Sequence, residues 1–141
     1  MKKYETLHLV KQEDLNHHGT LFAARAAEWL IEAGFAVAAL EHGNTDEVVL
    51  RNLRDLSYFS PTQKGTVLKL VGRVVYTGET SLMVVVTGKD SLTDKVKVEG
   101  YMTFVTIDAN TGGKKAHCVV LDETQDEEEI SLREKAQQFR K

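Results

Sequence analysis

The stretch that most limits the possible folds of this chain is an almost wholly apolar run that follows Phe22 and ends near Leu40. This run is about as long as a helix that crosses a membrane. It nevertheless contains Arg25, Glu28 and Glu32, and charged side chains are costly in lipid. The sequence therefore predicts a long helix buried in a folded protein, with no association with a membrane.

A polar loop leads into this predicted helix, with the sequence Asn-His-His-Gly-Thr-Leu-Phe over residues 16–22. The first backbone N–H groups of a helix have no partner inside it, and together they favour a negative charge. Such a place suits a carbonyl oxygen that becomes an oxyanion during a reaction. We therefore assign Gly19, Ala23 and Ala24 to a predicted oxyanion site at the helix start.

The rest of the chain has the pattern of β-strands, in which β-branched, aromatic or aliphatic residues alternate with polar ones. The expected strands cover residues 4–10, 48–59, 67–76, 81–87, 96–107 and 117–121. Turn-forming residues at 78–79 and 108–113 indicate antiparallel neighbours joined as a meander. An apolar helix needs cover on most sides, so we expect an α+β fold in which an antiparallel sheet wraps around one central helix.

The chain has 141 residues, which suffices for a single domain with a substantial core. We expect this domain to span residues 1–122, followed by a charged C-terminal helix over residues 123–141. Acidic residues come first in that last segment and basic residues come at its end, which complements a helix dipole. This helix offers too little apolar surface to fold alone, so we expect it to dock on the body or on a neighbouring subunit.

Charge and composition exclude several classes of function. A net charge of −3 gives no general attraction to nucleic acid or to an anionic membrane. The N-terminal residues lack the pattern of a secretory leader, so we expect a cytoplasmic protein. The single cysteine, Cys118, cannot form an internal disulfide, and its apolar neighbours predict a buried structural thiol.

Four segments of the sequence carry a resemblance to a known family. They are residues 16–34, 59–65 (Phe-Ser-Pro-Thr-Gln-Lys-Gly), 76–82 (Tyr-Thr-Gly-Glu-Thr-Ser-Leu) and 101–105 (Tyr-Met-Thr-Phe-Val). In their order and spacing they resemble the acyl-CoA hydrolase branch of the hotdog-fold acyl-CoA thioesterases, from about Leu9 to Leu121. The hotdog fold, a helix wrapped by an antiparallel sheet, agrees with the fold expected from the residue pattern.

The resemblance implies a thioesterase that hydrolyses an acyl-CoA to a free carboxylic acid and CoA. It implies no separate cofactor, because CoA is part of the substrate. In this branch an asparagine of the loop and an acidic residue of the helix, from different subunits, form the active site. The implied assembly is therefore a homo-oligomer built from dimers, a tetramer or a hexamer. Asn16 matches the asparagine, whereas Ile31 stands where the branch commonly has aspartate.

Two glutamates of the helix remain as candidates for the acid. Arg25, Glu28 and Glu32 are spaced i, i+3 and i+7, which places them on one narrow stripe. In one interpretation the stripe faces solvent and Arg25 pairs weakly with Glu28. In the other it faces a dimer partner, and Glu32 or Glu28 acts on the thioester as a general base or nucleophile. We favour Glu32, with Asn16 positioning the attacking water or the carbonyl.

The CoA phosphates are expected to contact basic side chains and the backbone amides of a turn. The turn occupies the place that contacts CoA in the family, although its sequence has Glu79 where the family usually has arginine. Arg51, Arg54 and Lys69 are equally available by sequence. The candidate CoA-binding residues are Lys64, Arg73, Gly78, Thr80 and Ser81.

Two alternatives to a thioesterase remain open from the sequence. The loss of aspartate at Ile31 is compatible with a hotdog protein that binds acyl-CoA or a related ligand without hydrolysis. His17 and His18 are compatible with the dehydratases of the same fold, but the only proline, Pro61, lies far from them. We expect no metal site, because these histidines have no partner at a ligand-like spacing. The acyl pocket is expected between subunits, lined by Phe22, Trp29, Tyr58 and Phe59.

Overall fold

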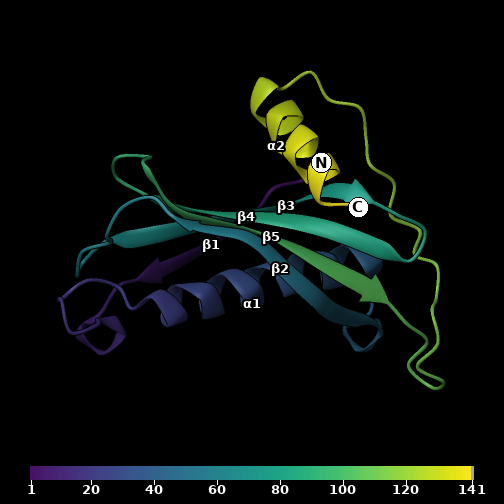
Figure 1. Ribbon diagram of the computed structural model, residues 1–141, viewed down its shortest axis with the longest axis horizontal. Coiled ribbons are helices and arrows are strands. Elements are labelled where there is room, and N and C mark those ends of the chain that lie inside the picture. Colours follow the sequence, from purple (N-terminus) through teal and green to yellow (C-terminus); the bar gives the residue numbers. More distant parts are fainter. Residues whose placement is uncertain (141) are drawn as a thin grey trace.

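The apolar run forms the long helix α1 (Ala23–His42), which lies along one face of a five-stranded sheet (Figure 1). The computed structural model describes residues 1–140. Alanine and leucine, which are strong helix formers, make up much of α1. Its buried residues, among them Ala26, Leu30 and Val37, face the sheet. No helix within residues 1–140 is both long and apolar enough to cross a membrane.

All strands of the sheet pair antiparallel in the order β1-β3-β4-β5-β2. The bounds are β1 (Tyr4–Leu9), β2 (Val48–Tyr58), β3 (Val67–Thr77), β4 (Ser81–Asp90) and β5 (Val96–Thr106), with short 3-10 turns η1 (Gln12–Asp14) and η2 (Thr45–Glu47). Strands β3, β4 and β5 follow one another through short turns and form the meander that the sequence predicts. Strands β1 and β2 occupy opposite edges, because α1 joins them across the face of the sheet.

The main core lies between α1 and the sheet. Aliphatic side chains of Leu68, Leu70, Val84 and Val86 on the strands are almost completely buried there. The alternation of apolar and polar residues along the strands places these side chains toward the helix. The expected α+β hotdog fold, a sheet wrapped around one helix, is confirmed.

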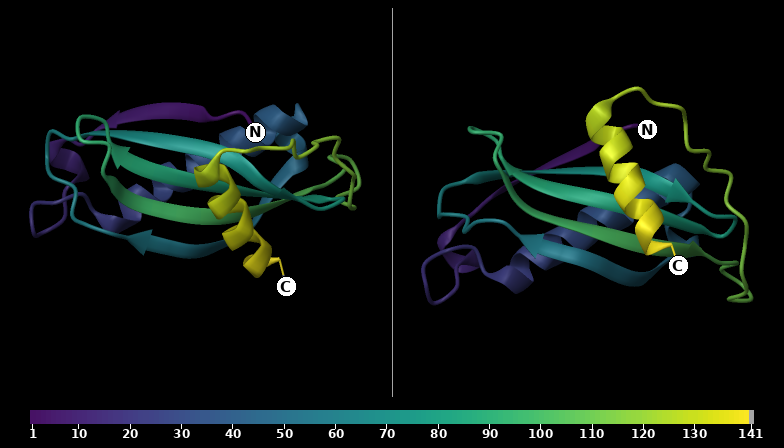
Figure 2. Two further views of the ribbon diagram at one scale, coloured as in Figure 1. Left: turned by 90° about the horizontal axis from the view of Figure 1, so that it is seen from above. Right: turned by 45° about the horizontal axis from the view of Figure 1, so that its top comes forward.

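A second helix, α2 (Glu127–Phe139), covers the opposite face of the sheet and runs across the strands (Figure 2). Its Ala136 packs with Val75, Val85 and Tyr101 in a smaller apolar cluster. The predicted C-terminal helix is therefore confirmed, and it docks on the body of its own chain. The sheet is consequently buried on both faces near its centre.

The predicted strand at residues 117–121 is wrong. This segment is irregular and runs past the β3–β4 turn, where the His117 Nε2 lies 2.8 Å from the Ser81 carbonyl oxygen. It has no free strand to pair with at that point, because β4 already pairs with β3 and β5. Cys118 is accordingly exposed on the surface and is not the buried thiol that we expected.

Candidate active site

The loop before α1 is held by the side chain of Asn16. Its Oδ1 accepts hydrogen bonds from the backbone N–H groups of His18 at 2.8 Å and Thr20 at 3.2 Å. Its Nδ2 donates to the Thr20 hydroxyl oxygen at 3.2 Å. Gly19 has a φ of +81°, a conformation that glycine adopts without strain, so the loop can turn tightly there. Asn16 therefore fixes the loop and keeps one amide N–H without a partner among residues 1–140.

The start of α1 has no side-chain cap. Phe22 is the N-cap residue, and its carbonyl oxygen accepts the first helical hydrogen bond, from the Ala26 N–H at 3.0 Å. The N–H groups of the first turn, at Ala23 and Ala24, lie at the exposed start of the helix. A helix start with open N–H groups favours an anion or a polarised carbonyl oxygen. The oxyanion site at this helix start stays a prediction.

An open groove of about 340 Å³ adjoins the helix start. One side of it is the end of β2 and the loop that follows, and the other side is the loop before α1. Its lining residues are Thr20, Leu21, Ala23, Tyr58, Phe59, Ser60, Pro61, Thr62, Lys97 and Val98. Two of the sequence segments that carry the family resemblance, residues 16–34 and 59–65, therefore meet at this groove.

Tyr58 ties the two sides of the groove together. Its hydroxyl donates a hydrogen bond to the Ala23 carbonyl oxygen at 2.6 Å. Partial burial raises the pKa of the Tyr58 hydroxyl, so it stays protonated at neutral pH and remains a donor. Nearby, the Leu21 N–H donates to the Thr62 carbonyl oxygen at 2.8 Å. Sequence reasoning missed the Tyr58 contact, because no local pattern places the end of β2 beside the start of α1.

Aromatic side chains stand exposed around this groove. Phe22, Tyr58 and Phe59 keep 51%, 47% and 56% of their surface accessible, and they remain candidates for an acyl-binding surface. Trp29, in contrast, is 8% exposed and stacks on His8 with ring centroids 4.5 Å apart. Within this chain Trp29 packs toward β1 and does not line the groove, and its place in a pocket between subunits stays a prediction.

Glu28 and Glu32 of α1 are exposed, and Arg25 does not pair with either of them. The Arg25 Nη1 lies 2.8 Å from Oδ1 of Asp14, a residue that is 2% exposed. The predicted Arg25–Glu28 pair is therefore wrong, since the buried Asp14 carboxylate takes the guanidinium. Within residues 1–140 neither Glu28 nor Glu32 forms an ion pair, so both carboxylates point to free surface.

One chain does not bring Glu32 to its own helix start. An α-helix rises 1.5 Å per residue, so Glu32 lies about 14 Å along the axis from Ala23, and Glu28 about 8 Å. A glutamate side chain is too short to cover the longer distance. Asn16 and Glu32 thus lie apart in a single subunit, and their proposed roles require a second one.

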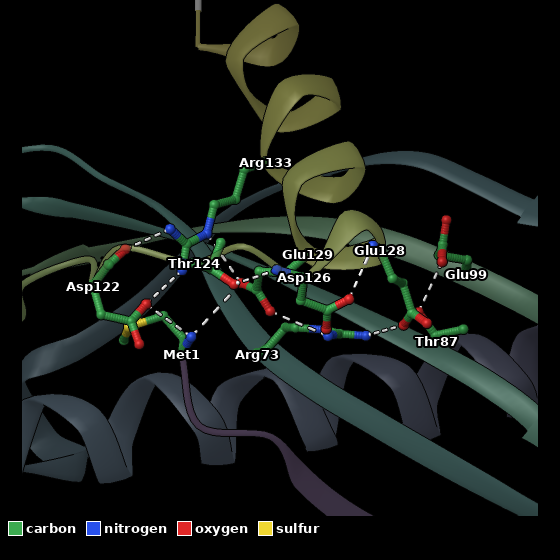
Figure 3. A network of polar contacts seen from close by, with 10 residues as sticks. All are labelled: Met1, Arg73, Thr87, Glu99, Asp122, Thr124, Asp126, Glu128, Glu129 and Arg133. Atoms are coloured by element: carbon green, nitrogen blue, oxygen red, sulfur yellow. Dashed lines mark hydrogen bonds and ion pairs between the residues drawn. The ribbon is translucent and has the colours of Figure 1, made fainter.

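The candidate CoA residues fall into two groups. The first group includes Gly78, Thr80 and Ser81 at the β3–β4 turn, where the Gly78 N–H donates a hydrogen bond to the Ser81 carbonyl oxygen at 2.9 Å. It also includes Lys64, which lies exposed in the loop before β3. Arg73 differs from them, because it is 1% exposed and pairs with Glu128 and Glu129 of α2 (Figure 3). The expectation that Arg73 contacts a ligand at the surface does not fit this burial.

The adjacent histidines of the loop form no recognisable site with other residues. The rings of His17 and His18 lie 3.9 Å apart, both residues are exposed, and neither lines the groove. Within residues 1–140 no three His, Cys, Asp or Glu side chains gather in a way that could hold a metal ion.

A family model described as the thioesterase superfamily matches residues 18–97. The chain belongs to the thioesterase superfamily. The matched segment contains the helix start, Glu28 and Glu32, the β3–β4 turn and all but one residue of the groove lining, although it begins after Asn16. The predicted membership in a thioesterase family is thereby confirmed.

Solved structures of similar proteins agree with this membership. An acyl-CoA hydrolase from Staphylococcus aureus, in complex with butyryl-CoA, CoA and CoA disulfide, is 27% identical with a TM-score of 0.85, covering 96% of this chain and 80% of its own. A hexameric acyl-CoA thioesterase without ligand is 29% identical with a TM-score of 0.82, covering 96% of this chain and 86% of its own. An acyl-CoA hydrolase from Bacillus cereus shares the fold, with 19% identity and a TM-score of 0.82. The match covers 97% of this chain and 83% of the hydrolase. No curated protein sequence matches significantly.

Proposed function

We propose that this thioesterase-superfamily protein hydrolyses an acyl-CoA thioester to a free carboxylic acid and CoA. The observation that carries the proposal is the uncapped start of α1, which opens onto the groove between Ala23 and residues 58–62. Structural similarity to acyl-CoA hydrolases over 96% of the chain supports the choice of substrate class.

The chemistry follows from these groups. The thioester carbonyl oxygen accepts hydrogen bonds from the backbone N–H groups near Ala23 and Ala24, which stabilise its developing negative charge. The free amide N–H of Asn16 orients the attacking water or the carbonyl. Glu32 of a second subunit takes a proton from the water as its oxygen bonds to the carbonyl carbon. The carbon–sulfur bond then breaks, and the CoA thiolate leaves with its electron pair, with little need for acid assistance.

A direct attack by the Glu32 carboxylate is a second route to the same products. It would form a mixed anhydride between Glu32 and the acyl group and release the CoA thiolate. Water would then hydrolyse the anhydride and restore the carboxylate. Both routes place the same residues in the same positions.

We propose a homodimer as the unit that completes this site. Strand β2 pairs only with β5 among residues 1–140, which leaves its outer edge open, and Val49 and Leu50 on it are exposed. The exposed side of α1 also carries Leu40, which keeps 64% of its surface accessible. An edge strand and an apolar helix face of this kind suit a two-fold contact with a second copy. The hexameric relative supports further assembly of such dimers.

Release of free thiol from short, medium, long and aryl acyl-CoAs tests the proposal directly. We expect turnover of at least one substrate by the wild-type protein and a loss of about a hundredfold in Asn16→Ala. His17→Ala serves as the control, because His17 is exposed in the same loop and should keep activity. Circular dichroism confirms that both variants fold. Absence of thiol release from every thioester rejects the enzyme.

One observation favours a second candidate, a protein that binds acyl-CoA without hydrolysis. The S. aureus hydrolase has been studied with single asparagine and aspartate residues replaced by alanine, and these two residues are as far apart in sequence as Asn16 and Ile31. Ile31 is half-buried and packs against the core. Binding of a CoA thioester without thiol release, together with a gain of hydrolysis in Ile31→Asp, would support this candidate.

A further inference from the structure

The hydroxyl of Tyr58 meets the start of α1 at a single peptide group. It donates a hydrogen bond of 2.6 Å to the carbonyl oxygen of Ala23, which is the first residue of the helix. That carbonyl and the N–H of Ala24 belong to the same planar peptide unit. The direction of the Ala24 N–H is therefore coupled to the oxygen that Tyr58 holds.

The Ala24 N–H is one of the groups to which the proposed function assigns the thioester carbonyl oxygen. The first backbone N–H groups of a helix have no partner inside it. Phe22, the N-cap residue, supplies no side-chain cap, and Ala24 is exposed. This N–H is consequently open to a substrate, and its aim depends on what holds its peptide group.

The sheet holds Tyr58 itself in place. Tyr58 is the last residue of β2 and pairs with Val98 of β5. Directly after it, the Phe59 N–H donates a hydrogen bond of 2.8 Å to the carbonyl oxygen of Lys97, also on β5. The hydroxyl thus reaches α1 from a fixed strand, which is the kind of rigid support that a positioning group requires.

No other side chain within residues 1–140 hydrogen-bonds to the peptide group of Ala23 and Ala24. A separate contact joins the loop before α1 to the other side of the groove, where the Leu21 N–H donates to the Thr62 carbonyl oxygen at 2.8 Å. That contact fixes residues that precede the helix. Loss of the Tyr58 hydroxyl would therefore leave this peptide group with its helical hydrogen bond alone.

A hydrogen bond to a carbonyl oxygen also strengthens the N–H at the other end of the same peptide. Peptide resonance draws electron density from the nitrogen toward the oxygen, and a donor at the oxygen increases this polarisation. The carbonyl oxygen has two lone pairs, so it can accept from Tyr58 and from the helix together. The contact thus affects both the direction and the strength of the Ala24 N–H as a donor.

We propose that Tyr58 is a positioning residue for hydrolysis, which aims and polarises the Ala24 N–H toward the thioester carbonyl oxygen. The inference rests on the proposed function, which places that oxygen at the helix start. Tyr58 makes no bond with the reacting atoms and acts through the peptide group of Ala23 and Ala24. All three residues lie in one chain, so this part of the site needs no second subunit.

Tyr58→Phe tests the inference, because it removes the hydroxyl and keeps the ring at the groove. We expect kcat for thiol release from an acyl-CoA to fall about tenfold and KM to change less than about twofold, since the N–H stabilises charge that develops only in the transition state. Tyr4→Phe is the matched control and should keep kcat. The Tyr4 hydroxyl makes an equally short hydrogen bond of 2.6 Å, to Glu41 near the other end of α1. An unchanged kcat in Tyr58→Phe would overturn the inference.

The NMR signal of the Ala24 amide nitrogen, in protein with isotopically labelled alanine, reports the contact without turnover. A hydrogen bond to the Ala23 carbonyl oxygen deshields this nitrogen, so we expect the signal to move upfield in Tyr58→Phe and to stay in Tyr4→Phe. A lowered kcat with an unmoved signal would mean that the hydroxyl acts on the substrate directly, which also overturns the inference. In protein that releases thiol from no thioester, the proposed hydrolysis fails. A moved signal then still supports the hold of Tyr58 on this N–H, and an unmoved one rejects it.

Discussion

Arg73 of β3 donates a hydrogen bond to the Glu129 carboxylate of α2 at 3.1 Å, and their side chains are only 1% and 3% exposed. Arg133 and the amino group of Met1 lie on the other oxygen of the same carboxylate (Figure 3). A buried charge that loses its partner is costly, because no water replaces the contact. This network decides how firmly α2 holds to the sheet.

We expect Glu129→Gln to lower the free energy of unfolding by about 3 kcal/mol, because it leaves the Arg73 guanidinium buried with less compensation. Glu128→Gln should cost less than about 1 kcal/mol, since the Glu128 side chain is 53% exposed and solvent screens its pair. Urea denaturation of the two variants measures both values. Equal losses would show that the buried carboxylate has no special role.

The strands and both helices could be predicted because their apolar residues repeat with a regular period. The segment 117–121 has the same alternation but forms no strand, since pairing depends on a free neighbour and β4 has none. Arg73 shows the same limit. An arginine between apolar residues of a strand is expected to face solvent. Nothing in the local sequence shows that α2, more than fifty residues later, covers Arg73.

The candidate site could be predicted where it depends on one continuous segment. The family resemblance indicated Asn16 and the loop composition indicated the helix start, and both lie in the one loop that leads into α1. Their catalytic roles stay predictions. The Tyr58 hydrogen bond depends on how distant segments align, which a single sequence does not specify.

Glu28 and Glu32 of α1 should differ in their effect on hydrolysis. We expect Glu32→Gln to lower kcat by about 100- to 10,000-fold, the range for loss of a general base or nucleophile. Glu28→Gln should lower it by less than about tenfold, because Glu28 only adds negative charge nearby. Steady-state thiol release from an acyl-CoA measures both. The reverse order would assign the catalytic role to Glu28.

Glu47 should make the stability of the protein depend on acid pH. Hydrogen bonds from Lys115 at 2.6 Å and His42 at 2.8 Å lower the pKa of Glu47 below its ordinary value of 4.5. A pKa lowered in the folded state stabilises the fold above the ordinary value. That stabilisation is lost as the pH falls from about 4.5 through the folded-state pKa.

Urea unfolding at pH 7 and pH 3 tests this expectation. The wild type should lose more stability between these two conditions than Glu47→Gln, which has no proton to gain at this site. Glu5→Gln, at an exposed position of β1, should behave like the wild type. An equal loss in Glu47→Gln and the wild type would show that the contact with Lys115 does not favour the charged form.

The close approach of α1 to β3 depends on Gly72. A Cβ atom at this position would lie 2.8 Å from Cγ2 of Val37, a side chain that is 2% exposed and branched at Cβ. Val37 has little freedom to move aside in a packed core. We therefore expect Gly72→Ala to destabilise the protein by about 1–3 kcal/mol in urea unfolding.

A double-mutant cycle with Val37 separates this clash from any other effect of the added methyl group. Val37→Ala alone should cost about 1–3 kcal/mol, because it leaves a cavity between helix and sheet. In the Val37→Ala background, Gly72→Ala should cost less than in the wild type, since the new methyl group enters the vacated space. Additive losses would mean that the helix does not approach β3 as closely as this contact requires. The cycle thus tests, in solution, the packing that sets the position of α1 and of its uncapped start at the groove.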